Sequence, residues 1–156
     1  MTDRRSLRSN GRVADRSLQG VVEADSFVEP QRHRVRWPVA AIYAGSTGVN
    51  KDRELAFGEG FEVLGTEGAR LFGYATRDGY VGYVKSSDLY SNLPKPTHRV
   101  TPARALVFAD NKGEYSAIMG LTMTAKVTVE TVEGDYAKLA SGGWMFTGNL
   151  AELGET

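Results

Sequence analysis

Short runs in which apolar and polar residues alternate fill the middle of the chain and predict β-strands. Residues 35–39 read VRWPV, which has the period of a half-buried strand, and Pro38 places that strand at a sheet edge. Residues 61–64, FEVL, form another alternating run before the turn sequence GTEG. Residues 71–84 supply two more strands, with an Asp-Gly hairpin signal at 78–79. Short strands at this spacing predict a small β-barrel.

The same pattern begins again after a stretch that contains Pro94 and Pro96, which deny a helix and favour extended backbone. Five segments of the first half have counterparts in the second at an offset of 61–66 residues: IYA (42–44) with VFA (107–109), FEVLGTEG (61–68) with VTVETVEG (127–134), FGYA (72–75) with YAKL (136–139), GYV (79–81) with GWM (143–145), and DL (88–89) with NL (149–150). An offset that stays between 61 and 66 residues over five segments indicates an internal repeat.

We therefore predict an all-β chain of two tandem small barrels with an N-terminal extension. Its parts are a flexible basic arm (1–17), a lead-in segment (18–33), a first barrel (34–90), a proline-containing linker (91–98) and a second barrel (99–156). The arm is called flexible because it holds five arginines and few apolar residues. For the lead-in the sequence leaves two alternatives, a short helical turn or an extended segment that ends at Pro30.

Composition excludes several classes of function. Nineteen basic and nineteen acidic side chains cancel, which disfavours nucleic acid and anionic membranes as partners. Cysteine is absent from the sequence, which removes disulfides, thiolate metal ligands and a cysteine nucleophile. The chain also has no apolar run of the roughly 18 residues that a membrane span needs and no secretory signal pattern. We expect a soluble, cytoplasmic protein, although a periplasmic or secreted location stays open.

A search for catalytic chemistry finds little. The sequence has no G-x-S-x-G, H-E-x-x-H or Walker motif. His33 and His98 each precede the first strand of a repeat, without a second ligand at metal-binding spacing, so they are expected on the surface. Glu62 is expected on the solvent face of its strand, and Glu67 in a turn. This chain is therefore predicted to bind no metal or cofactor and to catalyse no reaction by itself.

Three residues of the first repeat are candidates for ligand binding. Glu59 lies between two glycines and two aromatics in AFGEGF (56–61), where it is either a turn acid or a carboxylate aimed at the cation of a ligand. In DGYVGYV (78–84), Tyr80 either packs in the barrel or offers its hydroxyl at the rim. Gly82 leaves a bare patch of backbone beside it that a peptide could approach. In the second repeat the corresponding places hold Trp144 and Phe146, and no acid matches Glu59, because its aligned stretch is IMGLT (118–122).

The chain resembles the tandem bacterial SH3 (SH3b) domains that precede the catalytic domain of NlpC/P60-type cysteine peptidases. The resemblance is carried, in the order of the family, by LQGVVEADSFVEP (18–30), LAFGEGFEVL (55–64), DGYVGYVKSSDL (78–89), PTHRVTPARALVFA (96–109) and SGGWMFTGNL (141–150). It implies an enzyme of the γ-D-glutamyl-L-diamino-acid endopeptidase (dipeptidyl-peptidase VI) type, acting on cell-wall peptides with a free N-terminal L-alanine.

The resemblance further implies that the first SH3b domain closes the substrate end of the catalytic cleft, and that Glu59 and Tyr80 hold the terminal ammonium of the peptide. The catalytic cysteine and histidines of such an enzyme would lie in a C-terminal NlpC/P60 domain beginning soon after Leu150, outside this chain. The main hypothesis is thus a substrate-gating and targeting region of a muropeptide endopeptidase. One alternative is a free-standing SH3b pair that binds peptidoglycan peptide or a protein, and another is a structural pair whose arginine-rich arm binds nucleic acid.

Overall fold

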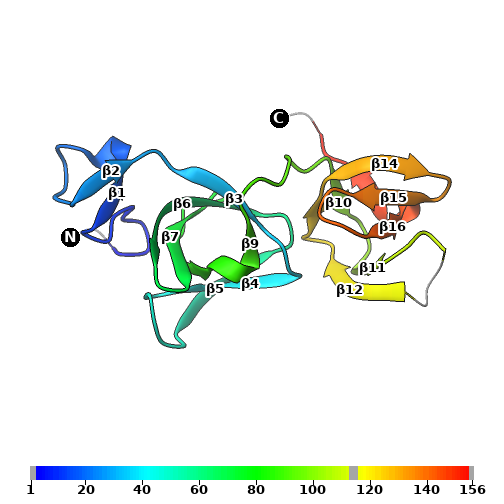
Figure 1. Cartoon of the computed structure of the whole chain (residues 1–156), viewed down its shortest axis with the longest axis horizontal. Coiled ribbons are helices and arrows are strands. Elements are labelled where there is room, and N and C mark those ends of the chain that lie inside the picture. Colours follow the sequence, from blue (N-terminus) through cyan, green and yellow to red (C-terminus); the bar gives the residue numbers. More distant parts are fainter. Residues whose placement is uncertain (1–2, 113–115, 155–156) are drawn as a thin grey trace. The chain divides into compact units, whose positions relative to one another are not determined.

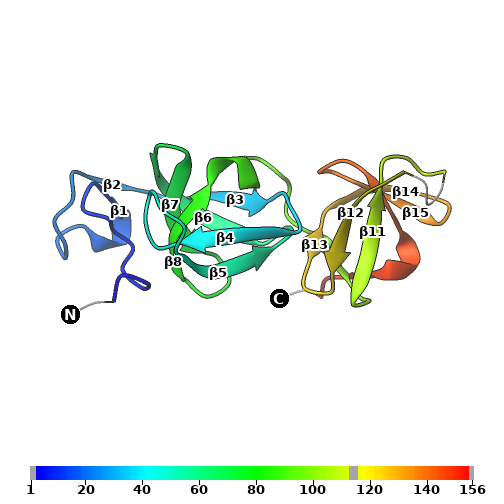
Figure 2. The ribbon, with the colours of Figure 1, turned by 90° about the horizontal axis from the view of Figure 1, so that it is seen from below.

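The computed structural model describes residues 3–112 and 116–154 and divides into two compact units (Figures 1 and 2). The first unit comprises the chain up to Val35, Ala40–Leu55 and Glu59–Asn92, and the second comprises Arg36–Val39, Ala56–Gly58 and the chain from Leu93 onward. The fold class is all-β, as predicted, with antiparallel sheets of the SH3-like barrel type. In the described residues, no helix is long and apolar enough to cross a membrane.

Up to residue 92 the elements are β1 (Val13–Asp15), η1 (Arg16–Leu18), β2 (Ser26–Val28), β3 (Gln31–Val35), β4 (Val39–Tyr43), β5 (Lys51–Ala56), β6 (Gly60–Glu67), β7 (Arg70–Ala75), β8 (Val81–Lys85), η2 (Ser86–Asp88) and β9 (Leu89–Tyr90). From residue 93 they are β10 (His98–Val100), β11 (Arg104–Phe108), β12 (Ala117–Thr122), β13 (Lys126–Val127), β14 (Val129–Glu133), β15 (Tyr136–Leu139), β16 (Trp144–Phe146), η4 (Thr147–Asn149) and β17 (Leu150–Glu152). The η elements are single 3₁₀ turns.

The main sheet of the first unit has the strand order β5-β4-β8-β7-β6-β3-β9 and curls around one core (Figure 1). Val35, Ile42, Phe61 and Val84 are fully buried there, because alternate side chains of each strand point inward. The predicted Asp-Gly hairpin is confirmed: β7 and β8 pair antiparallel, and Gly79 has a φ of 76° in the turn between them.

The single strand predicted over residues 35–39 is wrong, because β3 ends at Val35 and β4 begins at Val39. Val35 is fully buried, whereas Trp37 and Val39 are 42% and 53% exposed, so the three apolar residues do not share one face. Pro38 has no amide hydrogen to offer a ladder, and the chain turns there between two strands.

The second unit repeats the order of elements around its own core. Its sheets are β12-β11-β16-β15-β14 and β13-β10-β17, and its buried residues include Val100, Leu121 and Met145. A 3₁₀ turn precedes the last strand of each unit. A register shift occurs between Val63 and Gly65 in the β6–β7 pair, and a matching one occurs between Val129 and Thr131 in the β14–β15 pair. The two barrels therefore share strand order and the position of a β-bulge.

The segment Ala56–Gly58 belongs to the second unit although it lies within the sequence of the first repeat. Phe57 is 2% exposed in the cluster that contains Val100 and Val127, and its carbonyl accepts a hydrogen bond from the Lys126 amide at 2.9 Å. Phe57 falls within the predicted first barrel (34–90), because a local sequence pattern carries no signal for packing in a core formed mostly beyond residue 92.

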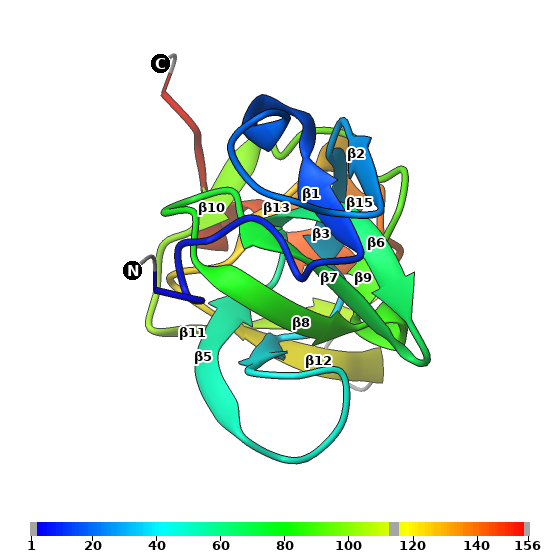
Figure 3. The ribbon, with the colours of Figure 1, turned by 90° about the vertical axis from the view of Figure 1, so that its left-hand side faces the viewer.

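The N-terminal extension, residues 3–33, contains the elements β1, η1 and β2, and Figure 3 views the chain from the side on which it lies. The parallel pair β1–β2 joins Val13 to Ser26. Within the predicted lead-in the extended alternative is present as β2, and η1 precedes that segment and shares only Leu18 with it. Val13 and Val28 pack on a second cluster, formed by Leu64, Phe72, Tyr74 and Val81, which lies outside the main core of the barrel. The extension therefore covers the outer face of β6 and β7.

Asp15 anchors this extension. Its side chain accepts hydrogen bonds from the Ser17 amide at 2.9 Å and from the Tyr74 hydroxyl at 3.2 Å, and the residue is only 6% exposed. Burial, the largest effect, raises the pKa of Asp15, but the hydrogen bonds from Ser17 and Tyr74 and the charge of Arg8 outweigh it and leave the pKa below the ordinary value.

Replacing Asp15 with alanine is expected to lower the free energy of unfolding by about 1–3 kcal/mol, because buried donors lose their acceptor. Since the folded pKa is depressed, the stabilisation is present above the ordinary carboxylate pKa of about 3.9 and is lost as the pH falls through the lower folded value. Urea unfolding of wild type and variant between pH 2 and 7 measures both effects. The control is Asp25→Ala, an exposed acid of the same extension, and an equal loss in both variants would contradict this role.

Candidate functional site

Glu59 lies directly before β6 and is held by both its backbone and its side chain. Gly58, at a φ of 82°, makes the turn that precedes it. The Glu59 carbonyl accepts from the Val35 amide at 3.0 Å, and its side chain accepts from Arg77 at 2.7 Å. Glu59 is 7% exposed. It is therefore a buried, ion-paired carboxylate and not a solvated turn acid.

The backbone position of Glu59 recurs in the second unit with a different side chain. There the Val100 amide bonds to the carbonyl of Ala125 at 3.1 Å, which is the counterpart of the Val35–Glu59 bond. The sequence alignment had placed the counterpart of Glu59 in residues 118–122, a few residues too early. The carboxylate of the first barrel is replaced by a methyl group in the second.

Tyr80 is the last residue of the β7–β8 connection, residues 76–80. Its carbonyl accepts from the Ala75 amide at 2.9 Å, and its own amide donates to the Asp78 side chain at 3.1 Å. The ring packs partly against the barrel core, and the Arg53 guanidinium lies over it, 4.4 Å from the ring centroid. The ring of Tyr80 therefore packs in the barrel, and the availability of its hydroxyl to a ligand stays a prediction.

Charged side chains of the same connection link Glu59 to Tyr80. Arg77 pairs with Glu59 and approaches Asp78 at 4.0 Å, Asp78 pairs with Arg53, and Arg53 stacks on Tyr80. Tyr80 also lines an open hollow of about 410 Å³. In the described part of the chain its lining residues are Asp3, Arg5, Ser6, Arg53, Asp78, Gly79 and Tyr80. Glu59 is therefore linked to this hollow through Arg77 and Asp78.

Gly82 lies in β8, opposite Gly73 of β7, and is buried. A Cβ atom at this position would collide with the Ile42 side chain and would lie 2.7 Å from the carbonyl oxygen of Tyr43. The space beside Gly82 is therefore filled by β4, whereas the sequence had suggested open backbone there. The role of Gly82 in holding a ligand remains a prediction, and its visible role is to let two strands approach closely.

The same close approach occurs in the second unit at Gly143. A Cβ atom there would lie 2.6 Å from Val107 and 3.1 Å from the carbonyl oxygen of Phe108. Gly82 is thus the structural counterpart of Gly143, which corrects the sequence alignment of Gly143 with Gly79. With this register the β7–β8 connection (76–80) is longer than the β15–β16 connection (140–143), and the extra length carries the charged residues beside Tyr80.

Glu62 does not face solvent as expected. It is 8% exposed, pairs with Arg32 at 2.6 Å and accepts a hydrogen bond from Thr76. The alternation was read correctly, since Phe61 faces the core, but the outer face of β6 is also covered. Strand alternation marks the two faces of a strand and does not tell whether the outer face meets water.

The histidines occupy equivalent positions in the two units. His33 lies in β3, paired with Phe61, and its Nδ1 lies 3.2 Å from the carbonyl oxygen of Gln31. His98 begins β10, and its Nδ1 lies 2.7 Å from the Thr97 hydroxyl. In residues 3–112 and 116–154, no group of three or more histidine and acidic side chains is arranged to hold a metal ion.

The charged residues that contact Glu59 and Tyr80 could not be recognised from the sequence pattern. Asp52 and Arg53 lie in the polar run KDREL (51–55) at the start of β5, and neither they nor Arg77 were among the candidate residues. The alternating signs of charge in that run were the one available signal. Their pairing with the β7–β8 connection and with the N-terminal arm links residues far apart in sequence, which a local pattern does not report.

Part of this chain matches a known family model, and most of it is similar to solved structures. Residues 45–89 match the family model of the bacterial dipeptidyl-peptidase Sh3 domain. The crystal structure of an NlpC/P60 family protein from Bacillus cereus is similar at 11% identity with a TM-score of 0.61, over 79% of this chain and 56% of that one. NlpC2 from Trichomonas vaginalis is similar at 16% identity with a TM-score of 0.38, over 79% of this chain and 48% of that one.

This chain thus spans about half the length of the solved structures it matches. No curated protein sequence matches it. The likeness to the Bacillus cereus protein shows a shared fold, and residues 45–89 are similar to the bacterial SH3 domain that the family model describes. Glu59, Tyr80 and Gly82 all lie within the matched residues.

Gly82→Ala is expected to lower the free energy of unfolding of the first unit by about 1–3 kcal/mol, because the new methyl group meets a backbone carbonyl that cannot move aside. Gly45→Ala is the matched control, since a Cβ there makes only an ordinary 3.6 Å contact with the Thr47 carbonyl. Urea unfolding followed by fluorescence measures the difference. Equal midpoints for the two variants would show that Gly82 is not required for strand packing.

Proposed function

We propose that this chain is a substrate-gating and targeting region, built from SH3b domains, of a bacterial cell-wall peptidase of the NlpC/P60 type. The observation that carries the proposal is the match of residues 45–89 to the bacterial dipeptidyl-peptidase Sh3 domain, because that stretch contains both Glu59 and Tyr80. The second barrel would be a further SH3b domain of the same protein.

The chemistry of the first unit supports selection of a peptide by its free amino terminus. A buried carboxylate and a phenol make charge-assisted hydrogen bonds to an ammonium group, and an acylated amine cannot replace these bonds. Arg77, whose side chain is half exposed, is the present partner of Glu59. An incoming ammonium would share the carboxylate with Arg77 or displace it toward Asp78.

Bond cleavage would depend on another domain. The sequence has no cysteine, so the nucleophile of a cysteine peptidase would have to come from outside this chain. The contribution of the barrels is therefore binding and discrimination: they favour the stem peptide with free L-alanine over the acylated one, and so raise the fraction of productive encounters.

The binding step is tested with the tripeptide L-Ala-γ-D-Glu-L-diamino acid, titrated calorimetrically into the chain. We expect Glu59→Gln and Tyr80→Phe each to weaken binding by about tenfold or more, since each removes a bond to the ammonium. Glu54→Gln, an exposed acid of β5, is the control and should bind like wild type. Equal affinity for the tripeptide and its N-acetylated form would contradict selection by the amino terminus.

The link to a catalytic domain is tested by the size of the native gene product, detected in cells with an antibody against this chain. A product much larger than this chain, with a cysteine peptidase domain after residue 156, is the expected result. A product of the same size as this chain would refute the attached enzyme and favour a free-standing pair of binding domains.

A further inference from the structure

The N-terminal arm occupies the surface beside Tyr80 in the way a bound peptide would. Its Arg4 guanidinium donates to both carboxylate oxygens of Asp52, at 2.7 and 3.4 Å. The Asp52 side chain is only 15% exposed, while that of Arg4 is 55% exposed. A largely buried carboxylate on β5 is therefore matched by a cation that the arm brings to it from outside the barrel.

The backbone of the arm is also bonded to the barrel. The Arg5 carbonyl accepts from the amide of Val81, the first residue of β8, at 2.7 Å. Two features are thus combined within consecutive arm residues: a cationic side chain on a carboxylate and a main-chain bond to a strand. Main-chain bonds of this kind give affinity for extended peptides, and side-chain contacts give selectivity.

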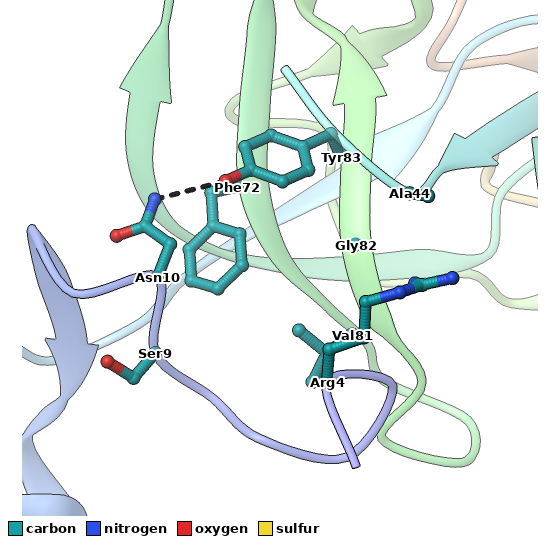
Figure 4. Close-up of a pocket in the computed structure, with 8 residues that line it drawn as sticks. All are labelled: Arg4, Ser9, Asn10, Ala44, Phe72, Val81, Gly82 and Tyr83. Carbon is teal, nitrogen blue, oxygen red and sulfur yellow. Dashed lines mark hydrogen bonds between the residues drawn. The ribbon is translucent and has the colours of Figure 1, made fainter. Parts of the chain in front are cut away.

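Further arm residues lie over the neighbouring part of the barrel. Figure 4 shows Arg4, Ser9 and Asn10 around a cavity of about 140 Å³ whose other lining residues include Gly82 and Tyr83. The side-chain amide of Asn10 donates a hydrogen bond to the Tyr83 hydroxyl at 3.3 Å. Asp3, Arg5 and Ser6 line the adjoining hollow together with Tyr80. The arm therefore lies over the surface that the predicted ligand would need.

The electrostatics of this surface favour a cation. The hydrogen bond from Arg4 is the main reason that the pKa of Asp52 lies below its ordinary value; the charge of Arg4 lowers the pKa further, and burial opposes both effects. The Tyr80 ring lies beneath the guanidinium of Arg53, the residue that follows Asp52 in β5. The nearby acid Glu59 is already paired with Arg77, which leaves Asp52 as the carboxylate that the arm supplies with a partner.

We propose that Asp52, Tyr80 and the Val81 amide form a docking site for an extended peptide that carries a cationic group, and that arm residues 3–6 are its internal occupant. An external peptide with an ammonium group that reaches Asp52 and a carbonyl that reaches Val81 competes with the arm. The inference rests on the proposed function in sharing Tyr80, and it places a second cationic group of the peptide, distinct from the terminal ammonium that the proposed function assigns to Glu59, on Asp52.

The arm acts as a competitor because it is covalently attached. A tethered ligand experiences a millimolar effective concentration, so even a weak arm contact reduces the apparent affinity for a free peptide. The arm therefore adds to the selectivity of the site, because only peptides whose affinity is high enough to displace it will bind.

The first experiment tests the docking site without any cell-wall ligand. A chain that lacks residues 1–6 is titrated with the synthetic peptide MTDRRSLRSN, which is residues 1–10. We expect saturable binding that becomes about tenfold weaker or more when the peptide carries Arg4→Ala or the chain carries Asp52→Asn. Glu54→Gln is the matched control and should leave binding unchanged. Absence of binding at millimolar peptide, or binding indifferent to both changes, overturns the inference.

The second experiment uses the full-length chain, so that it stands even if the shortened chain does not fold. We expect Arg4→Ala to raise the apparent affinity for the L-Ala tripeptide about fivefold, because the internal competitor is weakened. Adding Asp52→Asn to the Arg4→Ala variant should remove this gain, because the tripeptide then loses the carboxylate to which it binds. A tripeptide that binds with the same affinity in wild type and Arg4→Ala overturns the inference alone. A tripeptide that binds none of the variants, while the arm peptide still binds through Asp52, overturns the proposed function alone.

Discussion

The first barrel depends on the burial of both faces of β6 and β7. Their inner face contributes Phe61 and Leu71 to the core, and their outer face carries Leu64, Phe72 and Tyr74, which would be exposed in an isolated barrel. The N-terminal extension covers this outer face with Val13 and Val28. Apolar area removed from water stabilises both contacts, at roughly 25 cal/mol per Å². The extension is therefore an integral part of the fold of the first unit.

This coverage explains where the polar residues of the first unit lie. Asp15 of the extension and Tyr74 of β7 form a buried pair where the extension meets the barrel. Glu62 pairs with Arg32 on the adjoining part of β6. Once β1 is fixed on the barrel, the residues before it must run back across the surface, which brings Arg4 to Asp52 and Arg5 to Val81. The docking of the arm thus follows from the packing of an apolar face some distance away.

The second unit shows what the same fold is like without this cover. Its β14 strand is exposed over most of its length, with Val132 at 55% exposure. Ala125 replaces Glu59, and the shorter β15–β16 connection has no room for the charged residues that flank Tyr80. The close approach at Gly82 and Gly143 is nevertheless kept in both units. What the barrels share is thus the geometry of strand packing, and what distinguishes the first is a set of surface charges and a covering segment.

The sequence by itself determined the strands, the Asp-Gly hairpin, the repeat and the all-β class, because period-two alternation and turn residues such as Gly79 act over a few positions of the chain. It also singled out Glu59 and Tyr80. Only the tertiary structure decided that Glu62 is buried, that residues 35–39 divide between two strands, that Gly82 corresponds to Gly143, and that Asp52 holds the arm. Each of these depends on segments distant in sequence that cover or approach one another, and burial of that kind is a property of the assembled barrel rather than of any local run of residues.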